Sequence, residues 1–458
     1  MILETYTMHS IVDVINGSLT RIDFDSVQTV KVKECHNFYN LIDIYREDMT
    51  ITQSFIDCLA ICCAVHIAVR LESDPLWIYL VGPPSSGKST ICDLLSSDEH
   101  HTRALSKFTG LVSGSRQGQH LIPLLQNKCV IVKDGTLLLE STPQQLANVY
   151  GELRDIFDGS LEARYRNGVS ASFSNISFGM IIGITERIYG MNMSALGERF
   201  LHCRLETDRT NEIERNNSAI TSLLKGIKLN VAEGNDDGDA RSFPKQRSVT
   251  AGFLNHLHSR LSNESIIVPN YAPSDISFIQ SLADVIACSR ASVPRQRNED
   301  IAYTSRPEAS TRVAKQLTRL AVCLCYVYGT NSFNDTIRNN LRKVALDTSF
   351  SKQHDMIRSV ALSSKGLTRS GLAYATGMSM DMCLRRIEDM VSLSIFNKEK
   401  EPQRIGQGRR SHICTCPEWI ANSFRIVYNA ATPKDAESKP TPTTRINPFT
   451  RKKQQQKT

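Results

Sequence analysis

Short apolar runs alternate with helically spaced apolar residues over positions 52–206. The first run, residues 76–81, has turn residues on both sides and is typical of a buried parallel strand. Apolar residues recur every three or four positions over 146–157, and residues 52–71 have the composition of a buried helix. This alternation predicts an α/β fold with a parallel sheet. The other strand-like runs are 130–132, 180–184 and 200–205.

Beyond residue 206 the pattern becomes helical. A polar stretch rich in glycine and aspartate, residues 230–249, is typical of a loop or linker. Positions 353–427 form a small, separate unit, and the first 50 residues alternate in places, which suggests a small β-containing segment. The predicted helices are 251–261, 274–289, 312–328 and 333–346. The predicted divisions are residues 1–50, 51–206, 207–350, 353–427 and 428–458.

Composition places the chain among ordinary soluble proteins. Its 458 residues suffice for two to four domains, and 41% hydrophobic with 22% charged residues exclude a disordered chain. The longest apolar run, 58–69, is shorter than the roughly 20 residues of a membrane span. The first residues lack the basic segment of a secretion signal. Thirteen cysteines, two of them adjacent in an apolar helix, fit a reduced protein, so we expect a cytoplasmic chain with no membrane partner.

The formal net charge of +7 is concentrated in part at the carboxyl end. Residues 433–458 carry seven basic and two acidic side chains, four prolines and three consecutive glutamines. Such a composition predicts a disordered basic tail. The tail either binds a polyanion or only keeps the chain soluble.

A glycine-rich loop follows the first predicted strand and opens a helix. Its sequence, GPPSSGKS, fits the phosphate-binding pattern G-x-x-x-x-G-K-[ST]. Backbone amides of such a loop and the helix dipole point at phosphate oxygens, the lysine reaches the β- and γ-phosphates, and the serine ligates Mg²⁺. We therefore predict that ATP and Mg²⁺ are cofactors. The predicted binding residues are Gly82, Pro83, Pro84, Ser85, Ser86, Gly87, Lys88, Ser89 and Thr90.

A second metal carboxylate is expected at the end of a neighbouring strand. Residues 129–132 are apolar and lead through Lys133 to Asp134, which would hold Mg²⁺ together with Ser89. Many phosphate-loop ATPases have a glutamate next, which polarises the attacking water, but here Gly135 follows. Either another carboxylate replaces it, for which Glu140, Glu152 and Asp155 are the candidates, or hydrolysis is slow.

Three further segments complete a pattern. A buried strand ends at Thr185, the sequence LGERF brings Arg199 directly before the next strand, and Arg312 opens a helix in the following region. This order resembles the AAA+ ATPases, in particular the minichromosome-maintenance-like helicase branch and related phage and mobile-element replication ATPases. The resemblance implies that Thr185 senses the γ-phosphate, that Arg199 reaches it across a subunit boundary, and that Arg312 is a second sensor. It also implies a ring hexamer. An internal salt bridge for Arg199, an exposed helix position for Arg312 and an ordinary strand end for Thr185 are the alternatives.

A hairpin is predicted just before the strand that ends at Thr185. Asn167-Gly168 suits a tight turn, and the flanking residues alternate. Relatives that resemble this chain carry a hairpin there into the central pore. Arg164 and Arg166 could bind a DNA backbone by charge, or they could be solvated arginines on an ordinary hairpin.

The unit at 353–427 resembles a winged helix. Two helices, the second over 379–391, are followed by two predicted strands, 393–396 and 411–416, with a basic segment between them. We expect the second helix to offer Arg385 and Arg386 to DNA, and the wing to offer Lys398, Arg409 and Arg410. A protein-docking or purely structural unit is the alternative. His412, Cys414 and Cys416 could suggest zinc, but strand alternation explains them as well.

Two functional hypotheses follow. The first is an ATP-hydrolysing helicase or translocase that acts on single- or double-stranded DNA in the replication of a phage or mobile element, with replication proteins as possible partners. The second is an ATP-dependent DNA-binding switch or helicase loader with little turnover, which Gly135 favours. A small-molecule kinase is disfavoured by the long extension beyond residue 206.

Overall fold

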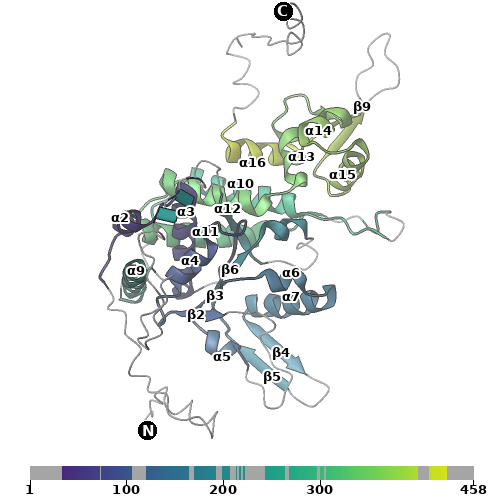
Figure 1. Ribbon diagram of the computed structural model, residues 1–458. Coiled ribbons are helices and arrows are strands. Elements are labelled where there is room, and N and C mark those ends of the chain that lie inside the picture. The colour runs from purple at the N-terminus through teal and green to yellow at the C-terminus, as the bar shows by residue number, and fades with distance from the viewer. Residues whose placement is uncertain are drawn as a thin grey trace, which may run out of the picture.

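The computed structural model describes most of the chain beyond residue 32 (Figure 1). The described residues are 33–72, 74–105, 120–164, 170–191, 199–206, 213, 216–217, 220–221, 243–263, 268–296, 300–303, 306–400 and 412–430, without the side chain of residue 137.

A five-stranded parallel sheet organises the amino-terminal half, as the α/β prediction required. Its strand order is β2-β3-β6-β1-β7. Every residue of β1, β3 and β6 is buried, which explains why these strands are continuous apolar runs. The four predicted strands are confirmed, but β2 was missed because it has no apolar run. The bounds are β1 Trp77–Val81, β2 Thr102–Leu105, β3 Cys129–Val132, β6 Gly179–Ile184 and β7 Leu201–Arg204.

Helices cover both faces of the sheet. On one face, α3 and α4 pack against Ile78 and Leu80 of β1, and on the other face α7 packs against Trp77 and Tyr79. The predicted helix over 52–71 is confirmed as α3 and the short η2, with the Thr52 hydroxyl accepting a hydrogen bond from the Phe55 amide. The helix bounds are α3 Gln53–Ile67, η2 Ala68–Arg70, α4 Lys88–Leu95, α5 Ile122–Leu125, α6 Thr136–Glu140, α7 Pro143–Phe157 and η3 Glu186–Gly190.

The most apolar helix of the described residues lies in the core. Residues 53–70 are long and apolar enough to cross a membrane by length and composition, and 67% of this window is buried inside the structure. Core helices commonly combine these two properties. The thirteen cysteines all lie in the described part of the chain, and none forms a disulfide.

Four long helices follow the sheet. The predicted helices are confirmed. The helix α9 begins at Pro244, however, so residues 244–249, which we predicted as the last part of a linker, are helical. The helix α2, which follows the undescribed residues 1–32, packs against α9. The predicted β-containing part of the first 50 residues lies outside the described residues. The bounds are α2 Phe38–Asp48, α9 Pro244–Asn263, α10 Pro273–Arg290, α11 Thr311–Tyr328 and α12 Asp335–Ser349.

The carboxyl-terminal unit consists of helices and a small antiparallel sheet of order β8-β10-β9. The predicted strand over 393–396 is wrong: Ile395 and Phe396 are buried in a turn, Ser394 has a φ of 59°, and β9 begins only at Asn397. The bounds are α13 Lys352–Ala361, β8 Leu367–Thr368, α14 Arg369–Thr376, α15 Met380–Ser392, β9 Asn397–Lys400, β10 His412–Thr415 and α16 Glu418–Tyr428.

This unit packs directly on the preceding helices. The helix α16 lies against α10 and α13, and the Arg342 Nε of α12 donates a hydrogen bond to the Val427 carbonyl at 2.8 Å. One continuous cluster of buried side chains runs from α3 through α11 to α15 and α16. Residues 353–427, which we expected to form a separate unit, therefore share buried side chains with the preceding helices.

The helix α12 also closes one edge of the parallel sheet. The strand β7 lies at the edge of the sheet, where backbone amides lack a neighbouring strand. Residues of α12 take the place of that strand: the His202 amide donates to Thr348 Oγ1 at 2.8 Å, and the Arg204 amide donates to Asp347 Oδ2 at 2.7 Å. The helical region is thus anchored to the sheet by hydrogen bonds as well as by apolar contact.

Candidate functional site

The glycine-rich loop joins β1 to α4, as the sequence predicted. Gly87 precedes the helix with a φ of 105°, a conformation that favours glycine. A Cβ at Gly82 would lie 2.7 Å from Ser86 Oγ, so that position has no room for a side chain. The Gly82 amide donates to the Ile184 carbonyl at 3.2 Å, which ties the loop to the end of β6. The loop therefore packs closely against the carboxyl ends of the adjacent strands β1 and β6.

Lys88 folds back over this loop. Its Nζ donates to the Gly82 carbonyl at 2.8 Å and to the Pro83 carbonyl at 2.7 Å. Partial burial lowers the pKa of Lys88, while the charges of Asp134 and Glu186 act in the opposite direction. Carbonyl oxygens do not neutralise an ammonium, so this charge is available to an anion bound in the loop.

Asp134 follows β3 and lies at the same edge of the sheet, because parallel strands end together. Its Oδ1 accepts hydrogen bonds from the Thr136 amide at 2.9 Å and from the Thr136 hydroxyl. These hydrogen bonds, with help from Lys88, lower the pKa of Asp134. The carboxylate is therefore ionised at neutral pH and exposed, as a Mg²⁺ ligand requires. Ser89, the other predicted ligand, is also exposed, in the first turn of α4.

Thr185 directly follows β6, which lies between β3 and β1 in the sheet. Its Oγ1 is buried and has no hydrogen-bond partner among the residues that the structure describes. A buried hydroxyl without a partner is costly and uncommon. The Thr185 hydroxyl, next to the loop and to Asp134, can therefore donate and accept hydrogen bonds at the carboxyl edge of the sheet.

Packing against β6 leaves room only for a glycine at position 135. Its amide donates to the Gly183 carbonyl at 2.7 Å, and a Cβ at this position would lie 2.5 Å from Ile182 Cγ2. A glutamate here would displace buried β6. The departure from the usual pattern is therefore a structural feature of the contact between β3 and β6.

A carboxylate that the sequence analysis missed is Glu186. It directly follows Thr185, is exposed, and its charge acts on Lys88. Of the predicted substitutes, Glu140 is 3.7 Å from Arg187 in an ion pair, whereas Glu152 and Asp155 lie on α7. The signal was present in the sequence, because Glu186 is the first acidic residue after the strand that ends beside the loop.

The two predicted arginines lie at the opposite edge. Arg199 precedes β7, and Leu201 pairs with Ile78 near the start of β1, whereas the loop follows the end of β1. Five strand residues at about 3.3 Å each separate these edges by about 16 Å. Arg312 lies close enough to Arg199 for their charges to interact. Both arginines are therefore far from the glycine-rich loop of the same chain.

The surroundings of these arginines contain an aromatic ring and charges of both signs. The Arg199 guanidinium lies 5.7 Å from the centre of the Phe157 ring, and burial and the charge of Arg312 lower its pKa. Arg312 pairs with Glu308 at 2.9 Å, and the Gln316 side chain on the same helix donates to the Arg199 carbonyl at 2.7 Å. The helix α11 thus holds both arginines in one place.

Those predicted DNA-contacting residues that the structure describes do not gather at one surface. The predicted hairpin is confirmed as β4 Ser160–Arg164 and β5 Ser170–Ser174, and it lies at the opposite end of the molecule from the carboxyl-terminal unit (Figure 1). Arg164 is exposed and pairs with Glu162 at 2.6 Å. Arg166, Arg409 and Arg410 lie outside the described residues.

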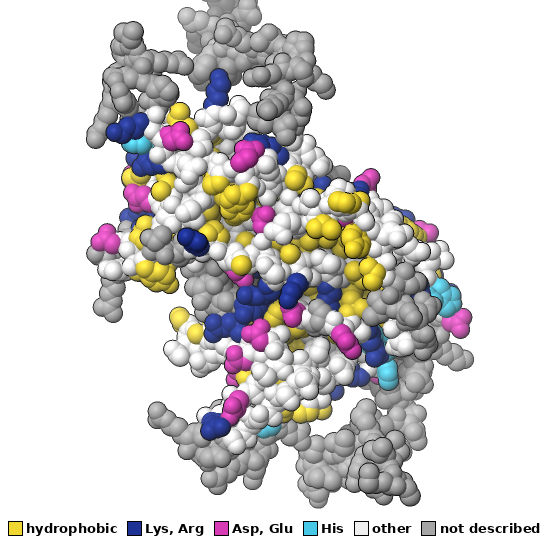
Figure 2. All heavy atoms as spheres, turned by 180° about the vertical axis from the view of Figure 1, so that it is seen from behind, with side chains coloured by type: hydrophobic (Ala, Val, Ile, Leu, Met, Phe, Trp, Pro, Cys, Tyr) yellow, Lys and Arg dark blue, Asp and Glu magenta, His cyan; other side chains and the backbone are white. Residues whose placement is uncertain are grey.

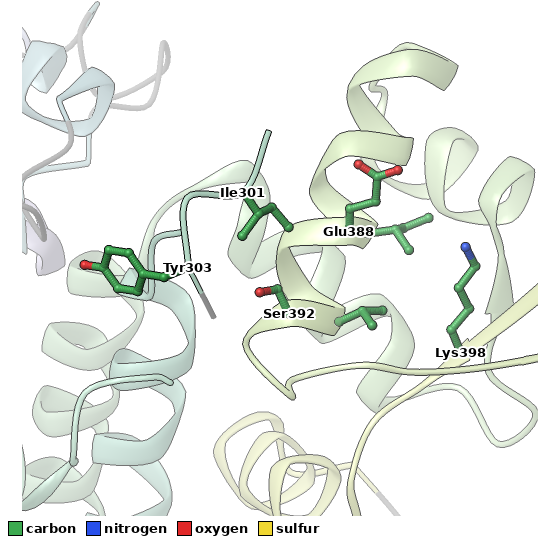
Figure 3. A pocket seen from close by; sticks show the side chains of 7 residues that line it. Ile301, Tyr303, Glu388, Ser392 and Lys398 are labelled. Carbon is green, nitrogen blue, oxygen red and sulfur yellow. The ribbon is translucent and has the colours of Figure 1, made fainter. Parts of the chain in front are cut away.

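On the carboxyl-terminal unit, Arg385 and Arg386 are exposed on α15 and Lys398 is exposed on β9. Arg386 is 3.8 Å from Asp389. A pocket of about 510 Å³ separates α15 from residues 300–303, with Glu388 and Ser392 on the helix side and Tyr303 opposite (Figure 3). One side of α15 therefore faces the protein.

Charge on the rear face is mixed (Figure 2). Basic side chains are interspersed with acidic ones, except for one group of basic side chains near the middle of that face. The described residues on this face therefore present no broad basic surface.

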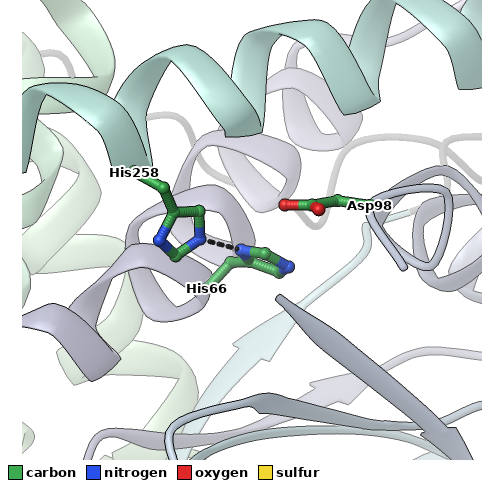
Figure 4. Close-up of side chains that lie close together, drawn as sticks. All are labelled: His66, Asp98 and His258. Atoms are coloured by element: carbon green, nitrogen blue, oxygen red, sulfur yellow. Dashed lines mark hydrogen bonds between the residues drawn. The ribbon is translucent and has the colours of Figure 1, made fainter. Parts of the chain in front are cut away.

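A buried histidine cluster was not predicted (Figure 4). The coordinating atoms of His66, Asp98 and His258 lie within 4.8 Å of one another, which would suit a metal ion. Hydrogen bonds account for the two imidazoles, however. Arg70 Nε donates to His258 Nδ1, so His258 Nε2 carries the proton and donates to His66 Nδ1 at 3.0 Å. His66 Nε2 then donates to Thr102 Oγ1 at 2.7 Å. We interpret His66 and His258 as neutral imidazoles that link α9 to the core by hydrogen bonds, whereas Asp98 pairs with His101 at 2.9 Å.

The residues considered for zinc do not form such a group. His412 is exposed and Cys414 is buried on β10, as expected for alternating strand positions.

No protein-family model matches the chain, and no curated protein shows significant similarity to it.

Proposed function

We propose that this chain is an AAA+ ATPase that acts on DNA and assembles into a ring with ATP at the subunit interfaces. The observation that carries the proposal is the division of functional groups between the edges of one sheet. The loop, Asp134 and Thr185 lie at the carboxyl edge, and Arg199 with Arg312 lies at the amino edge. A second copy of the chain would bring its arginines to the loop of the first.

The groups at the carboxyl edge fit a nucleoside triphosphate with Mg²⁺. Amides of the loop and the start of α4 would bind the phosphates, and Lys88 would exchange the Gly82 and Pro83 carbonyls for phosphate oxygens. Ser89 and Asp134 would hold Mg²⁺, which would neutralise charge on the phosphates. The unpartnered Thr185 hydroxyl would donate to the terminal phosphate or orient the attacking water.

In the absence of a glutamate at position 135, we assign the water-polarising role to Glu186. Its charge acts on Lys88, and it follows the residue that would contact the terminal phosphate. We expect Glu186→Gln to retain ATP binding and to lose most hydrolysis, with Glu140→Gln as the matched control.

The DNA part of the proposal is supported by two features. The exposed hairpin carries Arg164, and the carboxyl-terminal unit has two helices followed by an antiparallel pair of strands, the order of a winged helix. A helicase or translocase of a phage or mobile element uses such parts. The packing that imposes Gly135 favours the second candidate, an ATP-dependent switch or loader with little turnover.

The first experiment is ATP hydrolysis by the purified protein with and without single- and double-stranded DNA. We expect turnover that DNA increases, followed by strand displacement for a helicase. Tight ATP binding with negligible turnover would instead establish the switch. Failure of ATP to bind at all would refute both.

A further inference from the structure

A hydrogen-bond network surrounds Asp284 on α10. Its Oδ1 accepts from the Ser310 hydroxyl at 2.8 Å and from the Gln280 side-chain amide at 2.8 Å. Its Oδ2 accepts from the Ser423 hydroxyl at 3.2 Å. Ser310 directly precedes α11, and Ser423 lies on α16. One carboxylate therefore joins three helices that are far apart in the sequence.

The carboxylate itself is held on both oxygens. Gln280 lies one turn earlier on α10, and its amide also donates to Ser310 Oγ at 2.9 Å. Ser423 is buried, and its hydroxyl has the Trp419 carbonyl at 3.0 Å as a second acceptor. The helices α10 and α16 pack against each other (Figure 1). These contacts fix the orientation of the Asp284 side chain, as an anchor for another element requires.

Ser310 is used in an uncommon way. It occupies the N-cap position of α11, where a serine oxygen commonly accepts a hydrogen bond from an amide of the first turn. Its side chain makes no such bond here and donates to Asp284. The Ser310 carbonyl accepts the first helical hydrogen bond, from the Ala314 amide at 2.9 Å. The first turn of α11 is therefore held from outside the helix, by Asp284.

This first turn carries Arg312, two residues after Ser310. Between α10 and α11 the described residues contain an isolated β-bridge but no helix or strand, so no regular element holds the turn from that side. Arg312 pairs with Glu308 of the same segment at 2.9 Å. One turn further along α11, the Gln316 side chain donates to the Arg199 carbonyl at 2.7 Å. Hydrogen bonds thus hold the amino end of α11 at Ser310 and at Gln316.

We propose that Asp284 is a positioning residue for Arg312. The inference rests on the proposed function, in which the arginines of one copy serve the nucleotide bound to the next copy. A guanidinium acts on a phosphate at hydrogen-bond distance, so a displacement of the first turn of α11 by about 1 Å would remove much of its effect. Asp284 determines where this turn lies, and it acts through Arg312.

The test measures ATP hydrolysis by the full chain in single turnover, so that a parent with little turnover can be used as well. We expect Asp284→Ala to slow hydrolysis by about tenfold. The Kd for ATP should stay within about twofold, because the loop at Lys88 is unchanged. Ser310→Ala, which removes the bond at α11, should have a similar effect. Asp284→Asn should retain most of the rate, because its amide oxygen can still accept from Ser310.

The matched control is Ser277→Ala. Ser277 is an exposed serine of α10 whose hydroxyl donates to the Pro273 carbonyl of the same helix at 3.2 Å. This variant removes a serine hydroxyl as Ser310→Ala does, but not one that contacts Asp284. It should hydrolyse ATP at the rate of the parent.

Two further measurements separate positioning from a general loss of structure. The double variant Asp284→Ala with Arg312→Ala should hydrolyse ATP at the rate of Arg312→Ala alone, because both changes act through one side chain. Mixed assemblies of Asp284→Ala with Lys88→Ala should recover part of the activity. In such assemblies one subunit supplies an intact loop and its neighbour supplies a correctly placed Arg312.

The inference is overturned if Asp284→Ala retains the rate of the parent, if the effects of Asp284→Ala and Arg312→Ala multiply in the double variant, or if the mixed assemblies recover nothing. It also fails, while the nucleotide site stands, if Arg312→Ala retains the rate of the parent and Lys88→Ala abolishes ATP binding. A parent protein that binds no ATP would instead refute the proposed function, and this inference with it.

Discussion

The two edges of the parallel sheet differ in how they are built. The carboxyl edge is assembled from local sequence, because the loop, Asp134 and Thr185 each directly follow a strand. At the amino edge, Arg199 precedes β7, but Arg312 arrives from a helix more than a hundred residues later and is held by contacts of α11. The proposed nucleotide-binding half of the site is therefore a property of the motif, whereas the arginine half depends on packing of the helical region.

The largest expected effect is the loss of either edge. Lys88→Ala should abolish ATP binding, and Arg199→Ala should lower hydrolysis by about 10³-fold while ATP still binds, because an arginine on the transferring phosphate acts in the transition state. Lys245→Ala, a lysine paired with Glu47 on the surface, is the control. Equilibrium ATP binding and steady-state ATP hydrolysis are measured for each variant.

Mixing these two inactive variants tests whether the edges meet between subunits. Some interfaces would then combine an intact loop from one subunit with an intact arginine from the other. We expect partial recovery of hydrolysis. No recovery in assemblies shown to contain both variants would mean that the amino edge does not serve a neighbouring subunit.

A smaller effect is expected at Gly135, within the carboxyl edge. Gly135→Glu should lower the free energy of unfolding by about 1–3 kcal/mol through overpacking against Ile182, and it should not increase hydrolysis. Gly151→Glu on α7, where a Cβ would meet only the Arg154 side chain at 3.8 Å, should be nearly neutral. Urea unfolding measures the change in stability of each variant, and an ATPase assay measures the change in hydrolysis. A stable and faster Gly135→Glu enzyme would show that the position tolerates a catalytic glutamate.

The core beneath both edges should respond to acid. Burial lowers the pKa of His66 to about 4 and lowers that of His258 as well. The unfolded chain therefore binds protons first, so stability falls as the pH drops from about 6.5 towards 4, by about 1.4 kcal/mol per pH unit and histidine. His66→Gln should reduce this slope, and the exposed His36→Gln should not. Equal slopes in all three proteins would contradict the neutral link.

The smallest expected effect concerns the hairpin that leads into the amino edge. Arg164→Ala should weaken DNA binding a few-fold and reduce the salt dependence by about one ion, if the hairpin contacts phosphates. Glu162→Ala, which frees Arg164 from its ion pair, should strengthen binding. Fluorescence anisotropy at several salt concentrations measures both. Identical salt slopes in the three proteins would remove the hairpin from the DNA-contacting surface.

Local pattern determined much of this protein. Continuous apolar runs predicted β1, β3 and β6, because strands buried on both faces carry few polar residues. The edge strand β7 was predicted from a less continuous run that includes His202 and Arg204. The loop at 82–89 was predictable because its glycines, lysine and serine fit the spacing G-x-x-x-x-G-K-[ST]. The short strand β2 was not predicted, since its residues Thr102–Leu105 have no apolar run to mark them.

Only the tertiary structure decided the rest. The reason for Gly135 lies in a contact with Ile182 on another strand, and the proximity of Glu186 to Lys88 depends on the order in which the strands pair. The histidine cluster combines residues from distant helices. Periodicity specifies which face of an element is buried, but not which other element covers it, because that choice is made by the packing of the whole chain.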